Sequence, residues 1–195
     1  FDSLIAKWKG DNQDPNFNPL APVPKRKDRA DSDIDVTGLR AHWKALQDTH
    51  DFFGLLREFD VGRLQALRLA GNDFAYEVKP EALAQSLESA ASNDTPVMVF
   101  VGNPGCIQIH TGPVKNLKRM GPWFNVLDPD FNLHLREDAI ASAWAVFKPT
   151  RDGTVTSLEL YDKDGFCFAQ LFGARKPGKP ELQPWRDIVA ALPKA

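Results

Sequence analysis

The chain has 195 residues, of which 43% are hydrophobic and 26% are charged, and its formal net charge at pH 7 is −2. This is ordinary globular composition, and the length is enough for one domain with a full core. The small net charge gives no sign of a nucleic-acid partner, and no apolar run approaches the roughly 18–20 residues that a membrane-embedded helix needs.

The N-terminal part divides into a short helix and a linker. Residues 1–9, FDSLIAKWK, place four apolar side chains on one helical face. Residues 10–34 are polar and interrupted by four prolines, which predicts a linker. A similar helix with a Trp is predicted at the other end of the chain, over 181–192. This similarity between the two ends, and a first residue that is not Met, predict that residues 1–9 are the last helix of a preceding copy of the domain. The copy in this chain would occupy residues 35–195.

Helices are predicted for the next part of the chain. Apolar spacing predicts one long helix over about 36–58, followed by shorter helices over 61–70 and about 80–92. The long helix would carry an apolar stripe made of Leu39, Trp43, Leu46, Phe53 and Leu56. A gap of seven residues in this stripe is filled by His50. The pattern therefore places His50 inward, where a Leu would be usual.

From residue 96 onward the pattern alternates with a period of two, as in β-strands. Short apolar runs are bounded by Gly, Pro, Asn and Asp, and the dipeptides in RDG and KDG have hairpin turn chemistry. One helical turn is predicted at 136–141. The predicted strands are 96–102, 106–112, 114–120, 123–128, 131–135, 142–149, 154–161 and 166–172. Helices that precede successive hairpins in the sequence predict an α+β fold, a large antiparallel β-sheet with helices packed on it.

The two cysteines, Cys106 and Cys167, each fall in an apolar strand-like run. This predicts two buried thiols in a reducing compartment. The sequence gives no support for a disulfide between them.

Common catalytic and binding motifs are absent from the sequence. There is no P-loop, no GxGxxG and no zinc-ligand spacing, and Ser157 lies in a predicted strand without a nucleophile turn. We therefore assign no catalytic residue. Four histidines remain as candidates. His110 and His134 alternate with apolar strand residues, and His42 stands beside a Trp, so all three are expected at the surface.

His50 has two interpretations. A neutral imidazole on an apolar stripe is commonly a satisfied core histidine. The alternative is an axial ligand to a porphyrin iron. For that function Phe52 and Phe53 offer flat apolar surface, and Gly54 lacks a side chain that would block a planar ligand. The spacing alone leaves both interpretations open.

A haem ligand also needs cations for its two propionates. Arg63 begins the predicted helix that follows, and Lys148 ends the predicted strand WAVFK. Both are placed to reach the same pocket as His50. Taken singly, each could equally be a surface residue.

Several long stretches resemble one family, the HemS/ChuS/PhuS (HmuS) family of cytoplasmic haem-binding, haemin-degrading proteins of Gram-negative bacteria. They are LRAHWKALQDTHDFFGLLREF, VGRLQALRLA, VMVFVGNPGCIQIHTGPVKNL, the run from GPWFNVLD to FGARKPG, and WRDIVAAL. The resemblance covers about residues 35–192. Because the family has two tandem repeats, it implies that this chain holds the C-terminal repeat, with 1–9 ending the first and 10–34 joining them.

The resemblance also implies a set of site residues. His50 matches the histidine that ligates the haem iron, and Arg63 and Lys148 match the residues on the propionate side. Gln170 and Phe172 match further haem contacts near AQLFG, where relatives often have Tyr in place of Phe172. This difference removes one hydroxyl donor. Another haem-contacting arginine of the family belongs to the first repeat.

The function implied is cytoplasmic haem binding and trafficking in bacterial haem uptake. Haem would arrive from an inner-membrane importer and pass to a separate haem oxygenase. One alternative is an enzyme that degrades haem, and another is a half-domain that is inactive without the first repeat. The missing repeat, or a second copy of the chain in a homodimer, would cover the exposed surface.

Overall fold

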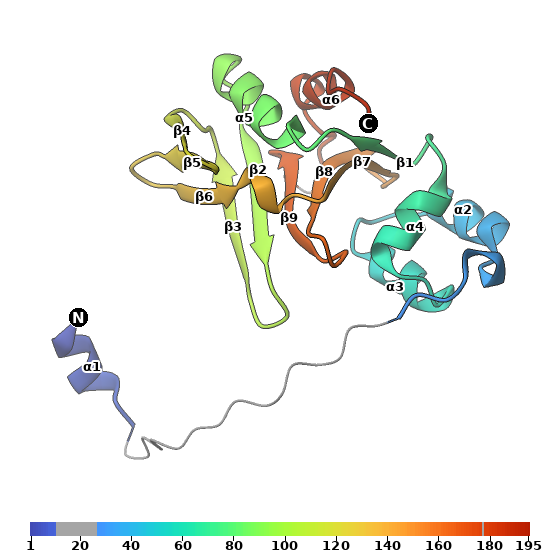
Figure 1. Ribbon diagram of the computed structural model, residues 1–195, viewed down its shortest axis with the longest axis horizontal. Coiled ribbons are helices and arrows are strands. Elements are labelled where there is room, and N and C mark those ends of the chain that lie inside the picture. Colours follow the sequence, from blue (N-terminus) through green and yellow to red (C-terminus); the bar gives the residue numbers. More distant parts are fainter. Residues whose placement is uncertain (11–26, 177) are drawn as a thin grey trace.

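The computed structural model describes residues 1–10, 27–176 and 178–195, and it has an α+β architecture (Figure 1). Short 3₁₀ turns lie at Asp31–Asp33 and Glu137–Ala139. The helices are α1 (Asp2–Trp8), α2 (Val36–Lys44), α3 (Asp51–Glu58), α4 (Arg63–Ala70), α5 (Ala82–Ser92) and α6 (Gln183–Ala190). The helices predicted over 61–70, 80–92 and 181–192, and the turn at 136–141, are confirmed.

The strands form two antiparallel sheets. The larger sheet has the order β1-β7-β8-β9-β2-β3, and the smaller has the order β4-β5-β6. The strands are β1 (Ala75–Val78), β2 (Val97–Gly102), β3 (Ile107–Gly112), β4 (Leu117–Met120), β5 (Trp123–Leu127), β6 (Asn132–Arg136), β7 (Ser142–Lys148), β8 (Val155–Tyr161) and β9 (Cys167–Gly173). Every predicted strand is present. β1 was not predicted, because four residues are too few to show a period of two.

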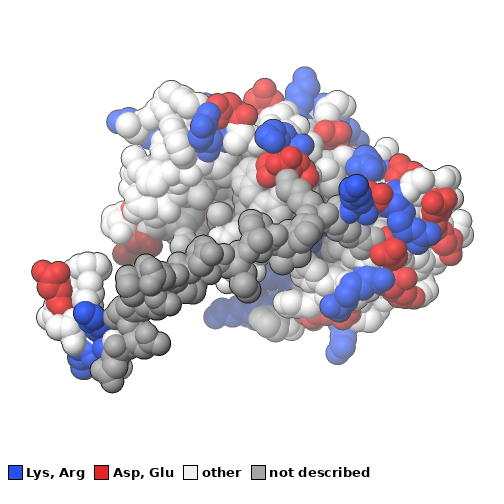
Figure 2. All heavy atoms as spheres, turned by 60° about the horizontal axis from the view of Figure 1, so that its bottom comes forward, with Lys and Arg blue, Asp and Glu red and all other residues white. Residues whose placement is uncertain are grey.

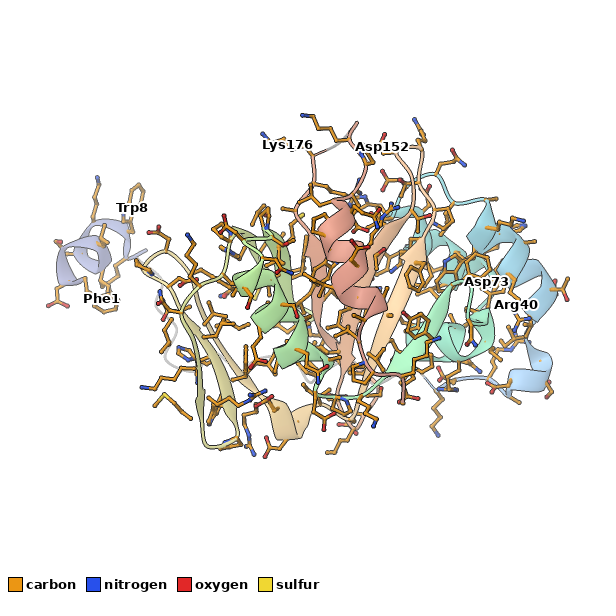
Figure 3. The ribbon with its side chains drawn as sticks, turned by 90° about the horizontal axis from the view of Figure 1, so that it is seen from above. Phe1, Trp8, Arg40, Asp73, Asp152 and Lys176 are labelled. Atoms are coloured by element: carbon orange, nitrogen blue, oxygen red, sulfur yellow. The ribbon has the colours of Figure 1, made fainter. Side chains whose placement is uncertain are left out.

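The two faces of the large sheet pack on different helices. Side chains alternate between the faces, so Leu158 and Leu171 lie in a core with α5 and α6. Val146 and Tyr161 point the other way, into a second core with α2, α3 and α4. Figures 1 and 3 show α5 and α6 lying along one face of the sheet and α2–α4 gathered at its β1–β7 end. Within the described residues, no helix covers the second face over β9, β2 and β3.

Charged side chains are distributed unevenly over the surface. In Figure 2 charged side chains of both signs crowd the α2–α4 end, whereas the opposite end shows a broader uncharged area with charged side chains around it. Two large apolar side chains of the edge strand β3, Ile107 and Ile109, are exposed to 56% and 55%. The uncovered part of the sheet is therefore apolar as well as open.

The terminal helices differ in their packing. Trp185 of α6 is fully buried and donates from Nε1 to the Thr156 carbonyl at 3.0 Å. In α1, Phe1 and Trp8 are 91% and 74% exposed, and Figure 3 shows this helix apart from the rest of the molecule. An apolar helical face that is exposed among the described residues is what the earlier-copy interpretation requires, and that interpretation stays a prediction.

The predicted linker, 10–34, falls largely on residues 11–26, which lie outside the described residues. Its last part is packed on the domain. Ile34 is buried in the core with α2–α4, and Gln65 donates from Nε2 to the Arg29 carbonyl and to Asp31 Oδ1, both at 2.7 Å.

The prediction of one long helix over 36–58 is wrong. The chain forms α2 and α3, with a turn at residues 45–50 between them. In this turn Asp48 Oδ1 accepts from the His50 amide at 2.9 Å, and Asp51 Oδ2 accepts from the Asp48 amide at 3.1 Å. Aspartate side chains that bond the nearby backbone in this way compete with helical hydrogen bonds. The sequence DTHD carried this turn signal.

The break also shifts the apolar stripe. Trp43 of α2 is buried as predicted, but in α3 the buried side chains are Phe52 and Leu55, and Phe53 is 58% exposed. The stripe of α3 is therefore one residue out of phase with a continuous helix. His50 stands at the N-cap of α3, outside both stripes.

Candidate functional site

A cavity of about 390 Å³ lies where the N-terminal ends of α3 and α4 meet the uncovered part of the sheet. The structure brings all five residues of the predicted site to it. His50, Arg63, Lys148, Gln170 and Phe172 line its wall. They come from four different elements and are up to 122 positions apart in the sequence (172 − 50).

Neighbouring strands supply the apolar wall. The register pairs Met98 with Phe172 and Phe100 with Gln170, so these four side chains stand side by side on the open face of the sheet. The rings of Phe100 and Phe172 contact edge-to-face, with centroids 5.2 Å apart. A cavity with this lining suits a flat apolar ligand.

His50 projects from the turn before α3, and its side chain is 90% exposed. The interpretation as a core histidine, and the inward placement by helical spacing, are both wrong. Its Nδ1 lies 2.6 Å from Asp48 Oδ1. A carboxylate only accepts hydrogen bonds, so Nδ1 carries a proton, and Nε2 is the nitrogen whose lone pair the neutral ring can offer to another ligand. Hydrogen bonds from the His50 amide and then its ring lower the pKa of Asp48.

Arg63 and Lys148 meet at a buried carboxylate, Glu159 of β8. Arg63 donates from Nε and Nη2 to the two oxygens of Glu159 at 2.8 and 2.7 Å, and Lys148 Nζ donates at 2.7 Å. Two hydroxyls donate to the same carboxylate, Tyr161 at 2.7 Å and Ser157 at 3.2 Å. Glu159 is fully buried, whereas the Arg63 side chain is 17% exposed at the cavity.

Glu159 was not predicted as a site residue, although the sequence held a signal for it. Ser157, Glu159 and Tyr161 alternate with Leu158 and Leu160 in a strand whose two faces are both buried. Three polar groups in succession on one buried face need partners, so they indicate a polar network.

The cluster keeps its charges by mutual pairing. Burial alone would raise the pKa of the Glu159 carboxyl, but the two cations outweigh it and hold that pKa well below its usual value. Burial also disfavours charge on Arg63, yet Glu159 raises its pKa. For Lys148 burial prevails, and its pKa is lowered. Two cations against one carboxylate leave a surplus of one positive charge in this cluster. Arg175 also lines the cavity, but it lies outside the cluster and is 4.0 Å from Asp152.

The two phenylalanines of α3 have different functions. Phe52 is buried beneath the cations, with its ring centroid 4.7 Å from Lys148 Nζ and 5.2 Å from the Arg63 guanidinium carbon. Phe53 is largely exposed at the cavity, with its ring 5.7 Å from the same guanidinium. Both rings line the cavity, as expected, but only Phe53 is largely exposed.

Gly54 faces away from this cavity, so its expected proximity to a planar ligand is wrong. It borders a different groove, between α2 and α3, together with His42 and Glu58. A Cβ added at Gly54 would meet no heavy atom within 4 Å.

Replacing Gly54 by Ala should therefore stabilise the protein and leave ligand binding unchanged. Ala loses less backbone entropy in a helix interior, which is worth about 0.5–1 kcal/mol in the free energy of unfolding. Urea unfolding measures the gain. Weaker binding at the cavity in Gly54→Ala would show that Gly54 has a function there after all.

The remaining histidines lie outside the cavity. His42 and His134 are exposed, as predicted, and bond to Glu58 at 3.1 Å and Asn125 Oδ1 at 2.7 Å. His110 is half-buried and stacks on Phe131 with ring centroids 3.8 Å apart, so its predicted surface position is only partly right.

The prediction of two buried thiols is wrong for Cys106, which is exposed in the turn before β3. Cys167 is half-buried, and burial raises the pKa of its thiol to about 12. Both cysteines are free, so they form no disulfide with each other.

The described residues contain neither a bare metal site nor a membrane-spanning helix. No cluster of three or more His, Cys, Asp or Glu side chains could hold a bare metal ion there. No helix in the same part of the chain is long and apolar enough to cross a membrane.

The chain matches a family model described as the haemin-degrading HemS.ChuX domain over residues 60–192. It is 47% identical over 152 residues to the hemin transport protein HemS of Yersinia enterocolitica, a match that covers 78% of this chain and 44% of that protein. The chain therefore spans about half the length of the curated relatives it matches.

Two solved structures are similar throughout the chain. Holo-PhuS, a heme-binding protein from Pseudomonas aeruginosa, is 47% identical with a TM-score of 0.95, over 100% of this chain and 56% of that one. The heme degrading enzyme ChuS of Escherichia coli O157:H7 is 42% identical with a TM-score of 0.85, over 98% of this chain and 55% of that one.

Proposed function

Because the chain belongs to the haemin-degrading HemS.ChuX domain family, we propose that its cavity binds haem and that the chain serves in cytoplasmic haem trafficking. One observation carries the proposal: a single apolar cavity presents a histidine at one point of its wall and a buried cationic cluster at another. Haem has the matching parts, an iron that takes an axial ligand, an apolar macrocycle and two anionic propionates.

The residues present fit this group. His50 would ligate the iron through Nε2, and the cluster of Arg63 and Lys148 would receive a propionate. Gln170 would offer its amide, and Phe172 would pack against the macrocycle without the hydroxyl that a Tyr would add. Bound haem would supply the redox-active iron, and the protein would supply ligation, charge and an apolar wall.

Asp48 is the residue that would hold the ligating imidazole in place. Its bond to Nδ1 fixes both the tautomer and the ring direction of His50. Such a partner also makes the ligating nitrogen more basic.

Replacing Asp48 by Ala should weaken haem binding by about 10–100-fold, the usual cost of losing a hydrogen-bond partner of a ligating histidine. A haemin titration followed by Soret absorbance measures the change. Asp51→Ala is the matched control, because it removes the other bond of the same turn and leaves the His50 ring paired. Equal affinities of Asp48→Ala and Asp51→Ala would rule out this function of Asp48.

The open half of the sheet suits a carrier that must release its ligand. Further protein would cover this surface in the longer relatives, either the first repeat or a second copy of the chain in a homodimer. The partners we propose for transfer are the inner-membrane haem importer as donor and a haem oxygenase as acceptor.

A transfer experiment tests this function. The haem-loaded chain is mixed with an apo-haem oxygenase, and the Soret spectra of both proteins are followed. We expect loss of haem from the chain and its appearance on the acceptor. Haem retained by the chain at equilibrium would contradict a carrier function.

Haem degradation is the second candidate, favoured by the family description and by the 42% identity to ChuS, described as a heme degrading enzyme. It predicts that the loaded chain bleaches its own haem when a reductant is added, and that catalase does not prevent the loss. Loose haem association that is unaffected by His50→Ala would instead indicate a half-domain that is inactive without the first repeat.

A further inference from the structure

Glu159 is a buried charged group behind the cavity wall that the proposed haem site does not use. It does not line the cavity itself, but its carboxylate lies directly behind the two cations that do. We propose that Glu159 is a positioning residue that holds Arg63 and Lys148 together. It also lowers the net charge of the three groups to +1, which one ligand carboxylate neutralises. This inference rests on the proposed haem site and adds a rule of recognition to it: one carboxylate, not two.

The geometry shows how Glu159 positions both cations. Arg63 approaches with Nε and Nη2 in the two-pronged arrangement that fixes a guanidinium plane, and Lys148 Nζ shares the oxygen that Nη2 contacts. Ser157 and Tyr161 hold the carboxylate from its own strand. The cations are therefore placed before any ligand arrives, which lowers the cost of binding.

Unused donors of both cations remain for the ligand. A guanidinium has five N–H donors and an ammonium has three. Within the described residues, the protein side chains that accept from them are Glu159 and, for Arg63 Nε, the Tyr161 oxygen at 3.2 Å. Both cationic groups line the cavity, so a carboxylate placed there would find several free N–H groups.

Charge limits the number of carboxylates. The cluster holds two cations and one anion, and an uncompensated buried charge is costly. One ligand carboxylate makes the cluster neutral, whereas a second would make it negative. One haem propionate therefore completes the cluster, and the other stays outside it. The remaining cation of the cavity wall, Arg175, already has Asp152 as its counter-ion at 4.0 Å.

A series of haem esters tests the rule on the unaltered chain. Haemin, its monomethyl ester and its dimethyl ester carry two, one and no free carboxylates. We expect the monoester to bind within about twofold of haemin, and the diester to bind roughly 10–100-fold more weakly, as expected for lost hydrogen bonds to charged groups. A monoester as weak as the diester, or a diester as tight as haemin, would overturn the inference.

A second test uses Glu159→Gln, which keeps the volume but removes the charge. Without Glu159, burial favours the neutral amine of Lys148, and the other ionisable groups near it are Arg63, Tyr161 and Cys167. A ligand carboxylate would then restore the charge on Lys148, so binding would take up a proton. The affinity ratio of haemin to its diester should fall as the pH rises, by up to about tenfold per unit.

The comparison is with the wild type and two control variants. The decrease in the affinity ratio of haemin to its diester should begin at a pH at least one unit lower in Glu159→Gln than in the wild type. It should be absent in Glu159→Gln/Lys148→Met. Ser157→Ala removes a bond to the same carboxylate without changing charge, and should follow the wild-type profile. Identical profiles for wild type and Glu159→Gln would overturn the inference.

The two proposals fail in different ways. If haemin does not saturate the wild type, or if His50→Ala binds it equally, the haem site itself is wrong. If haemin binds through His50 but the ester series shows no preference for one free carboxylate, only the function of Glu159 is wrong. If Glu159→Gln does not fold, the ester series on the wild type decides.

Discussion

Replacing His50 by Ala is expected to abolish the specific haem complex and to weaken haemin binding by more than about 100-fold. Loss of a partner of a ligating imidazole already costs about 10–100-fold, so loss of the ligand itself should cost more. The structure supports this because His50 presents its Nε2 while Nδ1 is bound to Asp48 at 2.6 Å. Soret absorbance during a haemin titration measures the change.

His42→Ala is the matched control for this variant. His42 is also an exposed histidine of the α2–α3 region, and it borders the groove on the other side of α3. It should bind haemin as the wild type does. A saturable one-to-one shift that survives in His50→Ala would remove His50 from the site, whatever the control shows.

Replacing Glu159 by Ala should strongly destabilise the protein. It leaves Arg63 and the buried Lys148 without their counter-ion, so that Lys148 must either keep an uncompensated charge or give up its proton, and breaking such a network costs about 3–5 kcal/mol in the free energy of unfolding. Lys148→Met is the matched comparison, because it leaves a neutral Arg63–Glu159 pair and should cost much less. Urea unfolding of both variants at pH 7 measures the difference, and equal losses would contradict this account.

The pH dependence of stability gives a check on the same network. The pKa of Glu159 is lowered on folding, so the unfolded chain binds more protons below its own glutamate pKa of about 4.3. The contribution of Glu159 is therefore complete above pH 4.3 and is lost as the pH falls toward the lower folded pKa. The gap in unfolding free energy between wild type and Glu159→Ala should narrow below pH 4.3. A gap that stays constant there would contradict the pairing.

Much of the fold could be predicted because it depends on short-range patterns. The alternation of apolar residues and the hairpin signals RDG and KDG located every strand except β1. The long helix failed for a local reason too: Asp48 and Asp51 bond the backbone of one turn and stop the helix. Spacing alone could not show this, because the apolar residues continue on both sides of the turn.

The lining of the cavity could be predicted better than its arrangement. The resemblance to a haem-binding family named His50, Arg63, Lys148, Gln170 and Phe172, and the structure brings them to one cavity. Helical spacing gave the wrong orientation for His50 and the wrong surroundings for Gly54. Glu159 was missed because its partners lie on α4 and β7, and only the folded sheet brings them to it.

An iron anomalous difference map from crystals of the chain grown with haemin would test the central claim most directly. The account predicts a single strong iron peak in bonding contact with His50 Nε2, with one propionate at Arg63 and Lys148 and the macrocycle against Phe172. An iron peak away from His50, or a macrocycle outside the cavity, would contradict it.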